Sequence, residues 1–135
     1  MSKLVVLDTS AFLSLGNLAD YNYQKATQIS KIIANQESTV IVPSDVFTEI
    51  ANVVGRKISH KAAVMQSQKI LSSEMFTIIE SSNDIRLSAL DMFKKQSESV
   101  SFTDCVVMAV ADYYETKDIF GFDGIFKKNG YKIPT

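Results

Sequence analysis

Short apolar runs alternate with amphipathic stretches along the chain, and this alternation predicts an α/β fold. Runs rich in Val, Ile and Leu that stop at a polar residue or a proline are typical of buried strands. Longer stretches with an apolar residue at every third or fourth position are typical of helices that bury one face. The expected strands are residues 3–7, 39–42, 76–80 and 118–120, with a short last strand at 131–133. The expected helices are residues 22–34, 44–54, 60–71, 84–95 and 103–114.

Serine and glycine residues between these stretches predict where the helices begin and end. The expected N-caps are Ser44, Ser59, Ser101 and either Ser81 or Ser82. Gly55 predicts the end of the helix that starts near residue 44. Strands that alternate with helices form a mostly parallel sheet with helices on both faces. Ligands bind such sheets beyond the carboxyl ends of the strands, so the candidate chemistry is expected there.

Length and composition restrict the class of protein. The chain has 135 residues, 46% hydrophobic and 21% charged, which predicts one globular domain over residues 1–135. Its longest apolar run, Cys105 to Ala111, is far shorter than the roughly 20 residues of a membrane helix. A single cysteine excludes an internal disulfide and a cysteine-rich zinc site. We therefore expect a soluble, cytoplasmic protein that does not bind membranes.

Four acidic residues occupy positions near the expected strand ends and helix starts. Asp8 ends the first strand, and Asp123 follows the strand at 118–120. Glu49 lies at the edge of the apolar stripe of its helix, and Asp104 lies in the first turn of a helix that is apolar all round. Each residue also has an ordinary structural explanation. Asp8 would suit a helix cap, Asp123 a turn, and Asp104 a capping box with Ser101.

Electrostatics decides what such a group of acids would do if its members met. Two carboxylates about 5 Å apart repel by about 3 kcal/mol at an effective dielectric constant of 20. A cluster of four would take up protons or bind cations. Ligands that are all oxygen suit Mg²⁺ or Mn²⁺ rather than zinc, and such ions serve phosphoryl chemistry. Convergence of the four acids would therefore indicate a metal-dependent nuclease.

Three blocks of sequence in a fixed order carry a resemblance to a known family. They are VVLDTSAFL near the start, VPSDVFTEIANVV in the middle, and SFTDCVVMAVA followed by FGFDGIF near the end. With these blocks the chain resembles the PIN-domain ribonucleases, and among them the small toxin subunits of VapBC-type toxin–antitoxin pairs. The resemblance implies a three-layer sandwich, with helices on both faces of a mostly parallel sheet of four or five strands.

The resemblance also implies the residues of an active site. Asp8 and Asp104 correspond to the direct ligands of Mg²⁺ or Mn²⁺, while Glu49 and Asp123 complete the pocket directly or through water. A metal-activated water would then hydrolyse a phosphodiester bond of single-stranded or structured RNA. Many relatives carry Ser or Thr two residues before the last acid, where this chain has Gly121. That difference concerns the role of Asp123 more than the pocket itself.

Further residues are candidates for contacts with RNA and with protein partners. The expected substrate-binding residues are Thr9, Ser10, Arg56, Lys57, Lys127 and Lys128, although the basic ones would equally suit a solvated surface. Apolar residues between positions 51 and 71 are expected to form either a groove for a small antitoxin protein or the interface of a homodimer, with core packing as the alternative. These are Val53, Val54, Ile58, Val64, Met65 and Ile70.

Three functions are compatible with these patterns. The first is a metal-dependent ribonuclease that is the toxin of a type II toxin–antitoxin pair. The second is a PIN nuclease of RNA maturation or decay without an antitoxin. The third is a non-catalytic flavodoxin-like binding or receiver module. The sequence disfavours that module, because Asp8 is not followed by a second acid and a central strand ends at Pro43 without an acceptor aspartate.

Overall fold

Four parallel strands form the centre of the fold. The computed structural model describes residues 3–135. The strands are β1 (Leu4–Leu7), β2 (Thr39–Pro43), β3 (Phe76–Ile79) and β4 (Ile119–Phe120), in the order β3-β2-β1-β4. All three neighbouring pairs are parallel. The last expected strand, residues 131–133, is wrong: only a single bridge joins Lys132 to Asp118, at the outer edge of β4.

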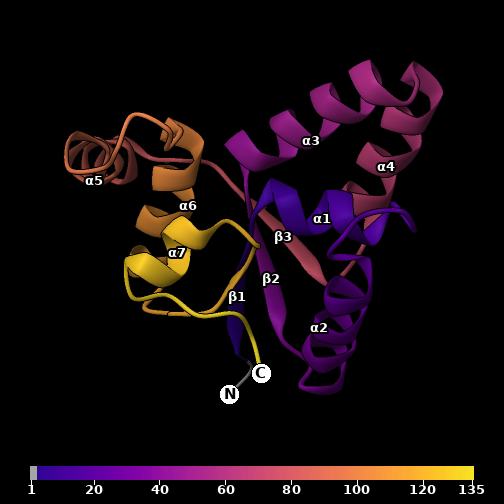
Figure 1. Cartoon of the computed structure of the whole chain (residues 1–135), viewed down its shortest axis with the longest axis horizontal. Helices are drawn as coiled ribbons and strands as arrows, with labels where there is room; N and C mark the ends of the chain where they lie inside the picture. The colour runs from indigo at the N-terminus through magenta and orange to yellow at the C-terminus, as the bar shows by residue number, and fades with distance from the viewer. Residues whose placement is uncertain (1–2) are drawn as a thin grey trace.

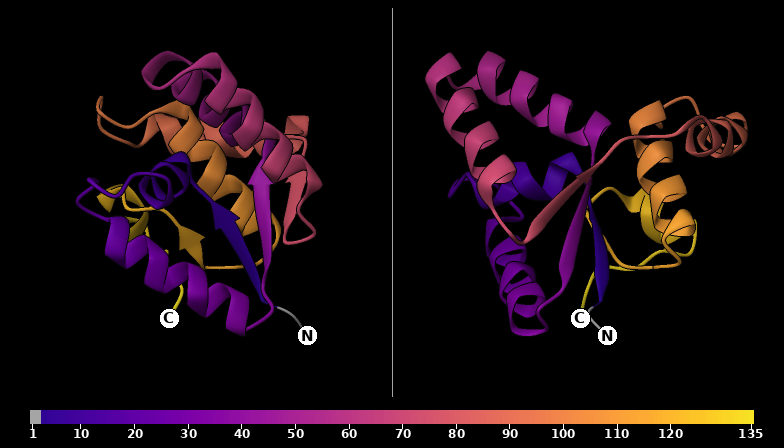
Figure 2. Two further views of the ribbon diagram at one scale, coloured as in Figure 1. Left: turned by 90° about the vertical axis from the view of Figure 1, so that its right-hand side faces the viewer. Right: turned by 180° about the vertical axis from the view of Figure 1, so that it is seen from behind.

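Helices cover both faces of this sheet. They are α1 (Thr9–Leu15), α2 (Tyr23–Asn35), α3 (Ser44–Lys57), α4 (His60–Ser72), α5 (Asn83–Lys94), α6 (Phe102–Tyr113) and α7 (Gly124–Lys128). Figure 1 views the sheet nearly edge-on, with α1, α2 and α4 on one side and α5, α6 and α7 on the other. The view from behind in Figure 2 shows the same three layers. The expected α/β sandwich with a parallel sheet is therefore confirmed.

Helix α6 forms the core of one layer. Every residue from Cys105 to Ala111 is buried, as its all-round apolar sequence predicts, and the helix packs on β1, β2 and β4. Strand β1 lies between two neighbouring strands and under helices of both layers, so Val5, Val6 and Leu7 are buried as well. Helix α6 is thereby fixed against the centre of the sheet.

Two of the expected helix signals are wrong. Ser44 does not cap α3: it is the first helical residue, Pro43 occupies the cap position, and no side chain caps the helix. Gly55 does not end α3, which continues to Lys57. A Cβ atom on Gly55 would lie 3.7 Å from the Cβ of Ala63, so this part of α3 packs closely on α4. That tertiary contact outweighs the low helix propensity of glycine. The caps expected at Ser59, Ser82 and Ser101 are confirmed.

The ends of the strands define two edges of the molecule. The C-terminus lies at the edge where β1 begins (Figure 1). The carboxyl ends of β1 and β2 lead directly into α1 and α3 at the opposite edge. No helix within residues 3–135 combines the length and the apolar character needed to cross a membrane.

Candidate active site

Asp8 lies at the carboxyl end of β1 and caps α1. Its Oδ2 accepts hydrogen bonds from the backbone N–H of Ser10 at 3.2 Å and from the Ser10 hydroxyl at 2.6 Å. The residue is only 4% exposed. Burial raises the pKa of this carboxyl to about 6, against the effect of the Ser10 hydrogen bonds, and the charges of Asp104 and Glu49 contribute to the rise. Asp8 is therefore both a helix cap and a buried acid whose ionised form is disfavoured by its surroundings.

Asp104 lies in the first turn of α6 and forms a capping box with Ser101. The Ser101 N–H donates to Asp104 Oδ2 at 3.3 Å, and the Asp104 N–H donates to Ser101 Oγ at 3.1 Å. Partial burial raises the pKa of Asp104, and the charges of Asp123 and Glu49 add to this, while the hydrogen bonds with Ser101 oppose it. The capping box fixes the carboxylate in one orientation at the positive end of the helix dipole.

Glu49 and Asp123 approach the same region from two other elements. Helix α3 begins directly after β2, and Glu49 lies half-buried on it, five residues beyond its first residue. Asp123 follows β4 and caps α7, where its Oδ1 accepts from the N–H of Ile125 at 3.0 Å. The proximity of these charges is visible in their effects, because Glu49 raises the pKa of both Asp8 and Asp104, and Asp123 raises that of Asp104.

The structure thus places Asp104 within electrostatic range of each of the other three acids at the carboxyl edge of the sheet, and Asp8 within range of Glu49. Their elements meet there because β1 and β4 are neighbours and α6 packs across both. Mutual repulsion and burial both favour neutralisation, either by protons or by a cation. Repulsion of this kind is typical of sites built to bind positive charge.

The carboxylate oxygens of the four acids are suitable ligands for a hard divalent cation that takes only some of its ligands from the protein. Within residues 3–135, no three acidic, histidine or cysteine side chains lie close enough together to hold a metal ion. Mg²⁺ commonly uses one or two carboxylates and retains several waters, and substrate phosphates supply further ligands. A pair of these carboxylates would suit this type of binding, whereas all four lack the nitrogen and sulfur donors that zinc prefers.

The family model described as PIN domain matches residues 5–130.

The chain belongs to the PIN-domain family.

Two solved structures share the fold of this PIN domain. VapC20 of Mycobacterium tuberculosis, described as a toxin that cleaves the sarcin-ricin loop, superposes with a TM-score of 0.83 at 24% identity, over 95% of this chain and 96% of that one. A toxin–antitoxin complex from Klebsiella pneumoniae superposes with a TM-score of 0.57 at 14% identity, over 85% and 82% of the two chains. No curated protein sequence matches significantly. Membership of the family does not support the receiver alternative.

The hydroxyl residues beside Asp8 are placed differently from expectation. Thr9 is 6% exposed, and its hydroxyl has no hydrogen-bond partner within residues 3–135, so burial keeps it from RNA in this structure. The Ser10 hydroxyl holds Asp8 Oδ2 and also accepts from the N–H of Phe122 at 3.1 Å. The Ser10 hydroxyl therefore holds the Asp8 carboxylate in place, a contact that the sequence does not reveal.

The basic residues expected to bind RNA lie at the surface of the PIN domain. Arg56 and Lys57 are exposed in the last turn of α3, and Lys127 and Lys128 are exposed in α7. The one ion pair found within the described residues joins Lys132 to Asp118 at 2.9 Å, so these four cations are not paired with acids there. Their contact with RNA remains a prediction.

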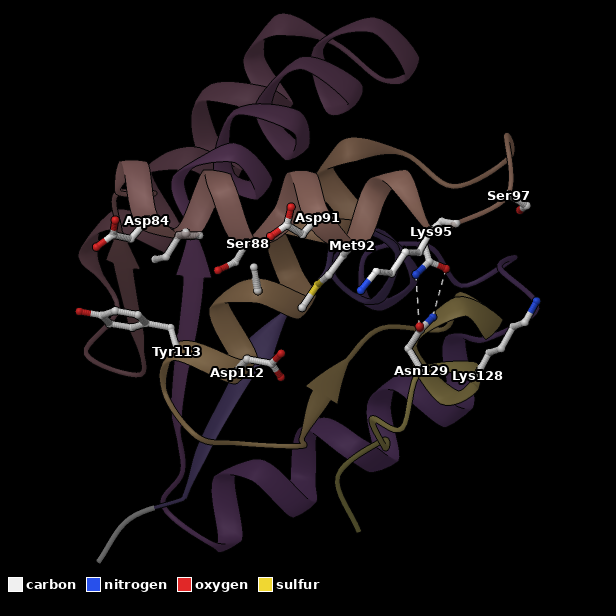
Figure 3. Close-up of a pocket in the computed structure, with 13 residues that line it drawn as sticks. Asp84, Ser88, Asp91, Met92, Lys95, Ser97, Asp112, Tyr113, Lys128 and Asn129 are labelled. Carbon is white, nitrogen blue, oxygen red and sulfur yellow. Dashed lines mark hydrogen bonds between the residues drawn. The ribbon is translucent and has the colours of Figure 1, made fainter.

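A groove of about 700 Å³ lies between α5, α6 and α7, away from the four acids. Figure 3 shows Asp84, Asp91 and Asp112 on its walls, with Lys128 at one end. The side-chain amides of Gln96 and Asn129 pair across that end at 3.2 and 3.3 Å. None of the four candidate acids lines this groove, so it is separate from the candidate active site.

Replacing Ser101 by Ala is expected to lower the free energy of unfolding by about 1 kcal/mol, because α6 loses the cap of its first turn. Urea denaturation measures the change. The matched control is Ser88→Ala on α5, whose side chain makes no hydrogen bond within the described residues and which should change stability by less than about 0.5 kcal/mol. Equal effects of the two substitutions would contradict a stabilising capping box.

Proposed function

We propose that this PIN domain is a Mg²⁺- or Mn²⁺-dependent ribonuclease and the toxin of a type II toxin–antitoxin pair. The observation that carries the proposal is the electrostatic coupling of Asp8, Glu49, Asp104 and Asp123 at the carboxyl edge of the sheet. Membership of the PIN-domain family supports nuclease chemistry. The two structural neighbours, one a toxin that cleaves the sarcin-ricin loop and the other a toxin–antitoxin complex, support the biological setting.

Each acid has a role in the proposed reaction. Asp8 and Asp104 would hold the cation, and Glu49 and Asp123 would complete its surroundings directly or through water. When bound, the divalent ion neutralises phosphate charge and makes a water molecule more acidic. Ser10 and Ser101 orient the two holding carboxylates before substrate arrives. Glu49 is only half-buried and Asp123 is exposed, so either carboxylate is accessible to accept a proton from the attacking water.

Local positive charge is proposed to bring RNA to the acids. The net charge of the chain is -1, so attraction of RNA by the protein as a whole is weak. The exposed residues Arg56, Lys57, Lys127 and Lys128 are available to contact phosphates on either side of the scissile bond. Such contacts fix the position of the backbone, and they make binding weaker as salt concentration rises.

Incubation of the purified protein with labelled RNA tests the proposal. Total RNA, a tRNA pool and ribosomal RNA are each offered with Mg²⁺ or Mn²⁺, with and without EDTA. We expect discrete cleavage products that require the metal and that return when Mn²⁺ is added after chelation. Folded protein that leaves every RNA class intact with both metals would refute the proposal.

An antitoxin is the proposed protein partner, and a groove of about 660 Å³ between α1, α3 and α4 is its proposed binding site. Apolar side chains dominate the lining, among them Phe12, Leu15 and Ile58. Lys57 and Lys69 also line it against one acid, Asp20, so the lining has a net positive charge and a segment with apolar residues and an acidic group would be complementary. Figure 1 shows α1 below α3, and α3 packs on both α1 and α4.

The structure corrects the residues that can take part in such an interface. Val54 and Ile70 are 4% and 1% exposed, so they belong to the core. Ile58 is 69% exposed and remains available to a partner. Val64 and Met65 are exposed on α4 and remain candidates for contact with a second copy in the expected homodimer.

Replacing Ile58 by Glu is expected to weaken binding of the proposed antitoxin by at least about tenfold, since a charge would enter the apolar groove. Calorimetric titration of the two purified proteins measures the affinity. Leu87→Glu is the control, because Leu87 is similarly exposed but lies on α5, on the other side of the sheet. Equal affinity of the Ile58→Glu variant and the unaltered protein would place the antitoxin elsewhere.

A further inference from the structure

We propose that Gly121 and Ser10 together position the Asp8 carboxylate: the glycine lets the chain beyond β4 lie against Asp8, and the serine hydroxyl ties the carboxylate to that chain. This inference rests on the proposed function, because it assigns the residues that hold a cation-binding carboxylate in place. Gly121 and Ser10 are positioning residues, acting through Asp8.

Strand pairing brings the two segments together. In the parallel ladder of β1 and β4, Leu7 lies opposite Phe120. The ladder continues by one more bond, from the N–H of Asp8 to the carbonyl oxygen of Phe120 at 3.0 Å. Gly121 is the next residue, and it is buried directly beside Asp8.

No side chain fits at position 121. A Cβ atom there would lie 2.6 Å from the Cβ of Asp8 and 2.9 Å from the Cε2 of Phe126. The Cβ of Asp8 is bonded to the backbone, so rotation of the Asp8 side chain cannot relieve this clash. Gly130 is the one glycine with a positive φ in the described chain, so Gly121 is required for space and not for a left-handed backbone. Any larger residue at 121 must displace Asp8 or the loop.

The Ser10 hydroxyl closes the link from the other side. It donates to Asp8 Oδ2 at 2.6 Å and accepts from the N–H of Phe122 at 3.1 Å. A hydroxyl offers one donor and two acceptor positions, so both bonds form at once. The Asp8 carboxylate is thereby connected to the residue that follows Gly121.

The geometry leaves one oxygen of Asp8 available. Oδ2 receives both bonds from Ser10, whereas Oδ1 receives no hydrogen bond from any donor within residues 3–135. Fixing one oxygen orients the other, and groups that orient a ligating carboxylate strengthen the binding of its metal. The sequence links Gly121 to the role of Asp123, but the atoms that a Cβ would meet belong to Asp8 and Phe126.

Two pairs of variants test the proposal through the affinity for Mn²⁺, measured by calorimetry without RNA. Gly121→Ala and Ser10→Ala are expected to weaken Mn²⁺ binding by about tenfold to a hundredfold. Gly124→Ala is the control for the first, because a Cβ at Gly124 meets nothing within 4 Å. Ser10→Thr keeps the hydroxyl and is expected to retain most of the affinity. In Ser10→Ala, the Phe122 amide is expected to exchange its hydrogen faster, since it loses its acceptor.

The outcomes separate this inference from the proposed function. If the unaltered protein binds Mn²⁺ and cuts RNA, and Gly121→Ala and Ser10→Ala bind Mn²⁺ equally well, only the positioning role is overturned. If the unaltered protein neither binds Mn²⁺ nor cuts RNA, the proposed function fails and the inference fails with it. If Gly121→Ala does not fold, the comparison of Ser10→Ala with Ser10→Thr decides. Equal loss of affinity in those two variants would overturn the role of the hydroxyl.

Discussion

Replacing Asp104 by Asn is expected to slow RNA cleavage by on the order of 10² to 10⁴-fold, the range typical for loss of a group that acts directly in catalysis. The amide has the shape of the carboxylate and can still accept from the N–H of Ser101, so the first turn of α6 should remain intact. What disappears is the negative charge that is coupled to Glu49 and Asp123. The initial rate of cleavage at saturating Mg²⁺ measures the effect.

The control for Asp104→Asn is Asp91→Asn. Asp91 is exposed on α5, and it forms no ion pair or side-chain hydrogen bond within the described residues. The control should cleave RNA at the rate of the unaltered protein. Full activity of Asp104→Asn would remove Asp104 from the catalytic group. An equal loss in both variants would indicate that net charge, and not the candidate site, governs the rate.

The long elements of the fold could be predicted because their signals are local. Each of β1, β2 and β3 is a short β-branched or apolar run, and the apolar run in α6 identifies a helix buried on all sides. The two short helices, α1 and α7, could not be predicted, because they are too short to give such a local signal. Helix α1 has seven residues and α7 has five, so neither contains enough turns to show a period. Their caps, Asp8 and Asp123, were nevertheless singled out as acids.

Features that depend on contacts between distant segments could not be predicted from the sequence. Gly55 looks like a helix end, yet the packing of α4 keeps α3 continuous past it. Gly121 gave no sign of its contact with Asp8, because that contact exists only when β4 pairs with β1, far away along the chain. In the same way, the bond from Phe122 to Ser10 joins residues that no local pattern connects.

The positions of the candidate acids were easier to predict than the neighbouring side chains that hold these acids in place. In a parallel sheet the carboxyl ends of all strands lie at the same edge, so acids that follow a strand or begin the next helix lie near that edge. The side chains that hold them follow from atomic packing, which the sequence does not encode in any short motif. For this reason the sequence suggests Ser10 only as a substrate contact, whereas the bonds of its hydroxyl to Asp8 and Phe122 appear only in the folded structure.

Replacing Asp8 by Asn is expected to stabilise the metal-free protein at pH 7.5 while abolishing cleavage. Burial raises the pKa of Asp8 from 3.8 to about 6 in the folded state. Each unit of such a shift corresponds to about 1.4 kcal/mol, so keeping Asp8 ionised costs the fold up to about 3 kcal/mol. Asn is neutral at every pH, it caps helices well, and its side-chain oxygen can accept from Ser10.

The sign of the pH dependence follows from which state holds the proton. Between about pH 4 and pH 6 the folded protein keeps a proton on Asp8 that the unfolded chain has released. The stability that this proton contributes is complete below the unfolded pKa and is lost as the pH rises through 6. The advantage of Asp8→Asn should therefore be largest at pH 7.5 and vanish near pH 4.

Urea denaturation in EDTA at pH 4 and pH 7.5 measures this advantage, with Asp91→Asn as the control that should show none. Excess Mn²⁺ should stabilise the unaltered protein at pH 7.5 and leave Asp8→Asn unchanged, because a ligand that binds only the folded state raises its stability. If Asp8→Asn were less stable than the unaltered protein at pH 7.5, the buried charge would not oppose folding. The Asp8 carboxylate would then be held by compensating interactions strong enough to need no cation.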